Sequence, residues 1–172
     1  PLVRIQEIEQ GLIKRVLDIG AAGILVPQVV GADEVEKAVR FAKYPPWGIR
    51  GVGGERATGW GMQLGEYTAI ANDETMVIPL VETVAAGKAI DAILDVPGVD
   101  AIQFGPADYS SSAGYLGQWM GPGVEAELLQ IKDKIRSRGV PCGIMATDVS
   151  NGVLRQQQGF QLLGVGSDAG LM

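Results

Sequence analysis

The stretches MVIPLVET, residues 76–83, and VDAIQFGPADYSSSAG, residues 99–114, decide the fold of this chain. Each begins with an apolar run that is typical of a buried β-strand, and each run is followed by an acid, Glu82 or Asp108. The two acids are 26 residues apart, which is the length of one strand–helix unit. In a parallel sheet, this spacing places both carboxylates at the carboxyl ends of neighbouring strands, where α/β folds hold their ligands. A divalent metal ion fits between two such acids.

Outward from this centre, apolar runs alternate with stretches of helical periodicity. Strands are predicted at residues 1–5, 23–27, 76–81, 99–104, 140–145 and 162–165, and helices at residues 9–19, 33–44, 64–72, 83–94, 125–138 and 149–158. Because parallel strands need a crossover that is usually a helix, this order predicts an α/β protein with one parallel sheet.

The number of repeats indicates an incomplete barrel. A (β/α)8 TIM barrel has eight strand–helix units, and six are recognised here, the first of them starting inside a strand. We therefore predict that residues 1–172 form a single domain, a (β/α)8 TIM barrel that lacks its first two βα units and the end of its last helix. A doubly wound sheet is the alternative, but it would carry a glycine-rich nucleotide loop, which we do not find.

Composition predicts one sizeable core, since 47% of the 172 residues are hydrophobic. The single cysteine and the lack of a signal-peptide or membrane-spanning pattern predict a cytoplasmic protein. The net charge of −6 argues against a nucleic-acid partner, and no run of like charges is present. The most apolar stretch, residues 21–32, is broken by Pro27 and is shorter than the ~20 residues that span a bilayer. No signal-peptide pattern precedes it. The single cysteine, Cys142, lies in a strand-like run, which predicts a buried thiol.

Three further features of the sequence bear on its chemistry. The chain has no histidine, the commonest general base at neutral pH, so chemistry that needs one must take it from elsewhere. Arg4 is the one charge in the first apolar run, which predicts either a buried ion pair, with Glu82 as a candidate partner, or a position at the mouth of a strand. The glycine- and proline-rich stretch 45–56 matches no phosphate-binding motif. It is interpreted as a structured surface loop, or alternatively as a lid or subunit contact.

These residues resemble the HpcH/HpaI aldolases, which are metal-dependent, class II pyruvate aldolases on a (β/α)8 barrel. The resemblance rests on short pieces that together span nearly the whole chain in the family's order. They are VR at residues 3–4, LDIG at 17–20, ILVPQV at 24–29, YPPWGIRGVGG at 44–54, VET at 81–83 and VPGVDAIQFGPADYSSSAG at 96–114.

The resemblance gives the two acids a specific role. Glu82 and Asp108 match the carboxylate ligands of the divalent metal, for which Mg²⁺ or Mn²⁺ is expected, with Co²⁺ or Zn²⁺ as alternatives. Without the resemblance, both acids could instead cap the helices that follow their strands, since acids are favoured there.

The resemblance also implies catalytic and substrate-binding residues. Arg4 matches the arginine that stabilises the enolate, and Asp18 matches the acid that supports the catalytic histidine. On its position alone, near the end of a helix, Asp18 is equally a structural acid. The substrate-binding segment, whose backbone holds the carboxylate of pyruvate at its last two residues, matches Gly105, Pro106, Ala107 and Asp108.

Two departures from the family pattern stand out. Leu80 lies where some members have a glutamine two residues before the metal-binding glutamate, so one polar contact is lost. The family's general base is a histidine in the loop of the second strand, and this chain has none. We expect that histidine to lie upstream of Pro1, because the chain begins at the third strand of the family pattern.

The implied activity is divalent-metal-dependent cleavage or formation of 4-hydroxy-2-oxo acids, to or from pyruvate and an aldehyde, through a metal-stabilised pyruvate enolate. The alternative is a non-catalytic partial barrel that binds metal and a 2-oxo acid, or only assembles. The family also implies a homo-oligomer, a trimer of dimers, because its members exchange their last helix between subunits. No nucleic-acid or membrane partner is expected.

Overall fold

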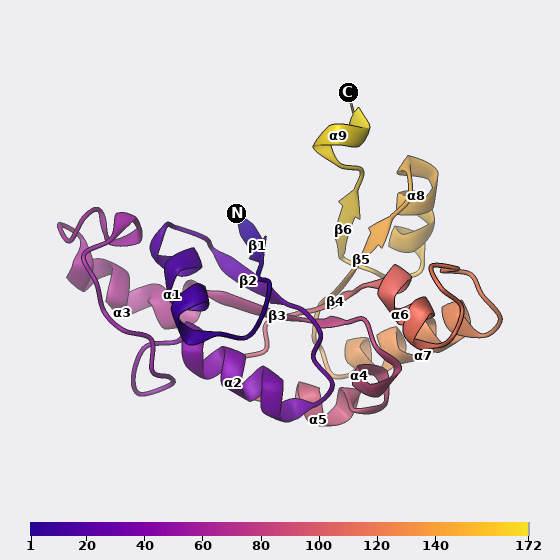
Figure 1. The fold of residues 1–172 in the computed structure, drawn as a ribbon, viewed down its shortest axis with the longest axis horizontal. Helices are drawn as coiled ribbons and strands as arrows, with labels where there is room; N and C mark the ends of the chain where they lie inside the picture. Colours follow the sequence, from indigo (N-terminus) through magenta and orange to yellow (C-terminus); the bar gives the residue numbers. More distant parts are fainter. Residues whose placement is uncertain (172) are drawn as a thin grey trace.

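Six parallel strands form one sheet in which the spatial order follows the order along the chain. The computed structural model describes residues 1–171, and its strands are β1 (Leu2–Arg4), β2 (Gly23–Val26), β3 (Met76–Val81), β4 (Ile102–Phe104), β5 (Cys142–Ala146) and β6 (Leu162–Val165). The sheet is curled, and helices cover its outer side, which gives a half-barrel (Figure 1). The prediction of six parallel strands in an α/β protein is therefore confirmed.

Helices form the crossovers between successive strands, as the sequence predicts, and one more, α9, follows β6. They are α1 (Gln10–Asp18), α2 (Ala32–Ala42), α3 (Leu64–Glu74), α4 (Val84–Lys88), α5 (Ile90–Leu94), α6 (Pro106–Ser112), α7 (Val124–Ser137), α8 (Val149–Gln157) and α9 (Asp168–Leu171), with a 3-10 turn η1 (Arg56–Thr58) in the long loop before α3. Across residues 1–171, no helix is both long enough and apolar enough to pass through a membrane.

Two helical segments differ from the prediction. Residues 83–94, predicted as one helix, form the two short helices α4 and α5. The sequence predicts a turn and a loop after residue 104, but the structure has the helix α6 there. Pro106 stands at its first position, where the missing N–H has no helical partner to lose. The hydroxyl of Ser110 donates to the carbonyl of Ala107 at 2.7 Å, which helps to close the helical turn.

Successive residues of each strand point to opposite sides of the sheet. Val81 and Phe104 point outward and pack with the helices in the buried core. Their neighbours in sequence, Leu80 and Gln103, therefore point to the inner side of the curl, which we call the concave face. Leu80 is in register with Gln103, and Gln103 with Gly143, so the three residues form one row across the concave face.

Two glycines on the concave face are covered by side chains from the preceding strand. A Cβ at Gly105 would lie 2.9 Å from the Cβ of Glu82 and 3.1 Å from its Oε2. In the same way, Oε1 of Gln103 occupies the space beside Gly143, where a Cβ would otherwise stand. The absence of a side chain on one strand thus decides where the side chain of its neighbour lies.

Arg4 and Cys142, two residues singled out by the sequence, differ in their exposure. Arg4 is exposed and is the last residue of β1, so its position at a strand mouth is confirmed. The alternative of a buried ion pair stays a prediction for the full-length protein. Cys142 on β5 is buried as predicted, and burial raises the pKa of its thiol to about 11.

Candidate active site

Glu82 is a buried acid at the carboxyl end of β3, with only 7% of its surface exposed. It follows the last residue of the strand, so the alternation of the strand turns its side chain to the concave face. Its Oε1 accepts a hydrogen bond from the backbone N–H of Gln28 at 2.5 Å. Its Oε2 lies against Gly105. Both oxygens are thereby fixed, one by a donor and the other by a close glycine.

Gln28, whose N–H binds Glu82, has an unusual backbone conformation that the sequence did not reveal. It lies two residues after β2 and has a φ of 55°, in the left-handed region that non-glycine residues seldom adopt. The hydroxyl of Thr83 also donates to the carbonyl of Val29 at 3.4 Å, so the loops after β2 and β3 are joined at two points. Strained residues of this kind concentrate at functional sites, where the surrounding structure holds them in place.

Asp108 and Arg4 act on Glu82 through their charges. Asp108 is an exposed residue in the first turn of α6, and Arg4 is at the carboxyl end of β1. Burial raises the pKa of Glu82, and the negative charge of Asp108 raises it further, whereas the N–H of Gln28 and the charge of Arg4 lower it. All three residues stand at the carboxyl ends of the parallel strands, after β3 and β4 and at the end of β1.

Two carboxylates at the carboxyl ends of neighbouring strands fit a hard divalent cation. Within residues 1–171, no three His, Cys, Asp or Glu side chains gather as a closed metal cage. A structural zinc site needs four such ligands, whereas Mg²⁺ is held by one or two carboxylates and keeps its other positions for water and substrate. The negative charge of Asp108 beside the buried Glu82 is unfavourable in the apo-protein, and a cation would relieve it. Glu82 and Asp108 are therefore the residues that would hold the ion.

The predicted substrate-binding turn lies beside the acids. Gly105 precedes α6, Pro106 is its first residue, and the N–H of Tyr109 donates to the carbonyl of Gly105 at 2.9 Å. The first N–H groups of a helix have no acceptor within it, so those of Ala107 and Asp108 point out of the helix start. The turn can therefore offer two backbone donors next to the carboxylates.

Asp18 lies at the other end of the sheet. It is the last residue of α1, shortly before β2 begins, so it is near the amino ends of the strands. It forms ion pairs with Lys14 and with Arg50, the latter at 2.8 Å. Arg50 is itself buried, with its guanidinium 4.6 Å from the ring centre of Tyr44. Within the described residues Asp18 therefore has a structural role in these two ion pairs. Its implied support of a catalytic histidine stays a prediction.

The environment of Arg50 supports the interpretation of residues 45–56 as a structured loop. Arg50 is only 2% exposed, so the middle of this stretch is anchored in the protein. The N–H of Arg50 donates to the carbonyl of Lys43 at 2.9 Å, and that of Ile49 to the carbonyl of Arg40 at 2.7 Å. The loop is therefore structured and fastened to the carboxyl end of α2.

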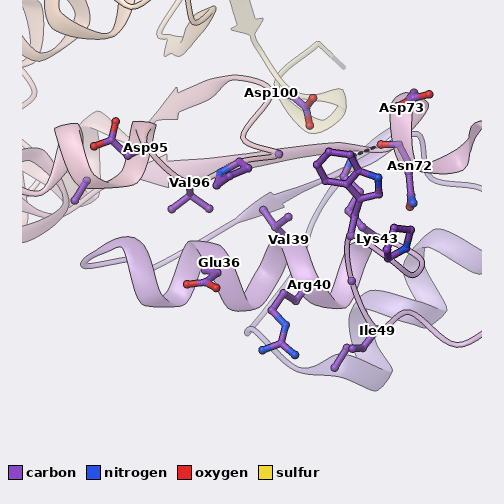
Figure 2. Close-up of a pocket in the computed structure, with 16 residues that line it drawn as sticks. Glu36, Val39, Arg40, Lys43, Ile49, Asn72, Asp73, Asp95, Val96 and Asp100 are labelled. Carbon is purple, nitrogen blue, oxygen red and sulfur yellow. Dashed lines mark hydrogen bonds between the residues drawn. The ribbon is translucent and has the colours of Figure 1, made fainter.

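A cavity beside α2 and α5 does not coincide with this site. It measures about 880 Å³ and is lined by residues of α2, α5 and the loops at the amino ends of the strands (Figure 2). Its buried Lys43 is already bonded to the carbonyl of Asn72 at 2.7 Å (Figure 2) and to that of Thr75 at 2.5 Å. In α/β folds of this kind, ligands bind at the carboxyl ends of the strands. We therefore assign the candidate site to Glu82 and Asp108 and not to this cavity.

Comparison with known proteins agrees with the geometry at the carboxyl ends of the strands. Residues 1–172 match the description HpcH/HpaI aldolase/citrate lyase over their whole length. The chain belongs to this family. The resemblance drawn from the short motifs is thereby confirmed.

Two relatives in the HpcH/HpaI family match most of the chain. A hydroxypyruvate/pyruvate aldolase of Roseobacter denitrificans is 43% identical over 150 residues, which are 86% of this chain and 58% of the relative. A 4-hydroxy-2-oxo-heptane-1,7-dioate aldolase of Shigella flexneri is 40% identical over 174 residues, which are 100% of this chain and 65% of the relative. The chain therefore spans less than two thirds of the length of either relative.

The curled sheet is shared with a solved member of the HpcH/HpaI family. A crystal structure of a family protein from Burkholderia cenocepacia matches this chain with a TM-score of 0.95 at 34% identity. The match covers 99% of this chain and 68% of that protein. The six strands and their crossovers are therefore arranged here as they are in that family member.

Proposed function

We propose that the full-length protein is a class II pyruvate aldolase, which cleaves 4-hydroxy-2-oxo acids to pyruvate and an aldehyde and catalyses the reverse addition. The observation that carries this proposal is the grouping of Glu82, Asp108 and Arg4 at the carboxyl ends of the strands in a chain of this family. The two relatives are named for 2-oxo acid substrates, pyruvate or hydroxypyruvate in one and a 4-hydroxy-2-oxo diacid in the other. A 2-oxo acid is therefore the donor that we assign.

We infer that the six strands are part of an eight-stranded barrel in the full-length protein, with two further βα units before β1 and the rest of a helix after α9. The high TM-score over two thirds of a longer family member supports this assembly. We further propose a homo-oligomer, a trimer of dimers. A monomer in light scattering of the full-length protein would contradict the oligomer without touching the activity.

The proposed cofactor is a divalent metal ion, Mg²⁺ or Mn²⁺, held by Glu82 and Asp108. When bound there, the ion would act as a Lewis acid on the 2-oxo group and lower the energy of the enolate. The buried position of Glu82 and its hydrogen bond from Gln28 keep its carboxylate in one orientation for this task.

The other residues of the site orient and stabilise the substrate. The N–H groups of Ala107 and Asp108, after Gly105 and Pro106, would hold the carboxylate of the 2-oxo acid. Arg4 places a positive charge on the same side as Glu82, where negative charge develops on the enolate oxygen. In cleavage, the bond between C3 and C4 breaks, its electron pair goes to the enolate, and the hydroxyl proton on C4 goes to a base. Residues 1–172 have no histidine for that last step.

Release of pyruvate tests the proposed function. The full-length protein is expected to form pyruvate from a 4-hydroxy-2-oxo acid, and EDTA is expected to stop the reaction until Mn²⁺ or Mg²⁺ is restored. Pyruvate is measured with a coupled lactate dehydrogenase assay. A protein that binds Mn²⁺ but releases no pyruvate would support the non-catalytic alternative. Activity that persists after metal removal would contradict the metal-dependent mechanism.

A further inference from the structure

Gln103 is a buried amide on the concave face that the site described above does not use. It is the middle residue of β4 and is only 5% exposed. On the same strand, it lies two residues before Gly105, against which Glu82 packs. Its neighbours in register are Leu80 on β3 and Gly143 on β5. Gln103 is thus placed one step below the acids, on the same face of the sheet.

The carbonyl oxygen of this amide has no hydrogen-bond partner among the described residues. A buried acceptor without a partner lowers stability, so natural proteins seldom retain one without a reason. The side chain is nevertheless held in a defined place, because its Oε1 fills the space beside Gly143. Glu82 is held beside Gly105 in the same manner. Glu82 and Gln103 are therefore positioned by the same device.

The side chains in register with Gln103 are apolar. The row across the sheet consists of Leu80, Gln103, Gly143 and Leu162. A single amide in such a row resembles the few well-placed polar groups that fix the orientation of a ligand in an apolar pocket. A half-turn about the last side-chain bond exchanges Oε1 and Nε2, so the amide can present a donor or an acceptor.

The chemistry of an amide limits what Gln103 can recognise. A keto or carboxylate oxygen can bind only the N–H groups of the amide, whereas a hydroxyl can donate to its unpartnered oxygen or accept from its N–H groups. Among the donor substrates considered above, hydroxypyruvate carries a hydroxyl on C3 and pyruvate carries none. We propose that Gln103 is a specificity-determining residue, which binds the C3 hydroxyl so that the site takes hydroxypyruvate in preference to pyruvate. This inference rests on the proposed aldolase function.

The test compares the two donors with one acceptor. The full-length protein with Mn²⁺ is assayed for addition of hydroxypyruvate or pyruvate to glycolaldehyde, and kcat/KM is measured for each donor. The wild type is expected to prefer hydroxypyruvate. The Gln103→Met variant keeps the length of the side chain but removes the amide, so kcat/KM for hydroxypyruvate is expected to fall by about 10- to 100-fold. The value for pyruvate is expected to stay within about threefold, because pyruvate has no hydroxyl to lose.

Two further variants make the result specific. Leu162→Met changes another residue of the same row and is expected to leave the ratio of the two donors unchanged. Gln103→Asn shortens the side chain but keeps an amide, and it is expected to lose the preference as Gln103→Met does. Thermal unfolding of each variant, measured separately, shows whether the protein is folded when it is assayed.

The possible outcomes separate the inference from the proposed function. An active wild type that prefers pyruvate, or a donor ratio unchanged in Gln103→Met and Gln103→Asn, overturns the role of Gln103 and leaves the aldolase function standing. An equal loss for both donors also overturns it, because a structural defect affects both alike. No addition with either donor overturns the aldolase function, and the role of Gln103 falls with it.

Discussion

Replacement of Glu82 by glutamine is expected to reduce kcat/KM for pyruvate release on the order of 10³-fold. A Lewis-acid metal contributes several kcal/mol to the stabilisation of the transition state, and each 1.4 kcal/mol or so is a factor of ten in rate. Glutamine has nearly the same shape and can still accept the hydrogen bond from Gln28, which is 2.5 Å long in the wild type. The change therefore removes the charge and leaves the packing. The coupled pyruvate assay of the full-length protein measures the effect.

A matched control for this change is available on α3. Glu66 is an exposed acid of that helix, and Glu66→Gln also removes one negative charge. It is expected to leave kcat/KM within about twofold of the wild type, as surface substitutions usually do. Equal activity of Glu82→Gln and the wild type would show that Glu82 is not a metal ligand.

The second large effect is expected for Gly105→Ala. The new methyl group would stand 2.9 Å from the Cβ of Glu82 and 3.1 Å from its Oε2, so the acid has to move. The backbone itself does not oppose alanine, because φ at Gly105 is −107°. A shift of about 1 Å at a catalytic site costs roughly 100-fold in rate, and overpacking a tight region costs about 1–3 kcal/mol of stability. Activity and thermal unfolding of the full-length variant measure the two effects.

Gly65 provides the control for the added methyl group. It lies in α3, and a Cβ there would meet nothing within 4 Å. Gly65→Ala is therefore expected to keep full activity and to raise stability by as much as about 1 kcal/mol, because alanine favours a helix. If Gly105→Ala kept wild-type activity, Glu82 would not need its present position.

The positions of Glu82 and Asp108 at neighbouring strand ends were predictable, because the pattern that indicates them is local. An apolar strand followed by an acid occurs at Glu82 and again at Asp108, and the parallel fold brings such strand ends together. The six strands themselves follow from apolar runs between helical stretches. For these features, the sequence pattern and the three-dimensional arrangement carry the same information.

Other parts of the site depend on contacts that no local pattern reveals. The N–H of Gln28 holds Glu82 through its backbone, so the identity of the side chain gives no signal, and its left-handed φ is imposed by the surrounding loops. The ion pair of Asp18 with Arg50 joins the end of α1 to a distant loop, and no local pattern in the sequence predicts it. The orphaned oxygen of Gln103 is likewise visible only when the neighbouring strands are in place.

Titration of the full-length protein with Mn²⁺, followed by the electron paramagnetic resonance signal of the free ion, tests the central claim most directly. The account predicts one Mn²⁺ site per chain in the wild type and the loss of that site in both Glu82→Gln and Asp108→Asn. A wild type that binds no Mn²⁺, or variants that bind it as tightly as the wild type, would contradict the assignment of these two carboxylates as the metal ligands.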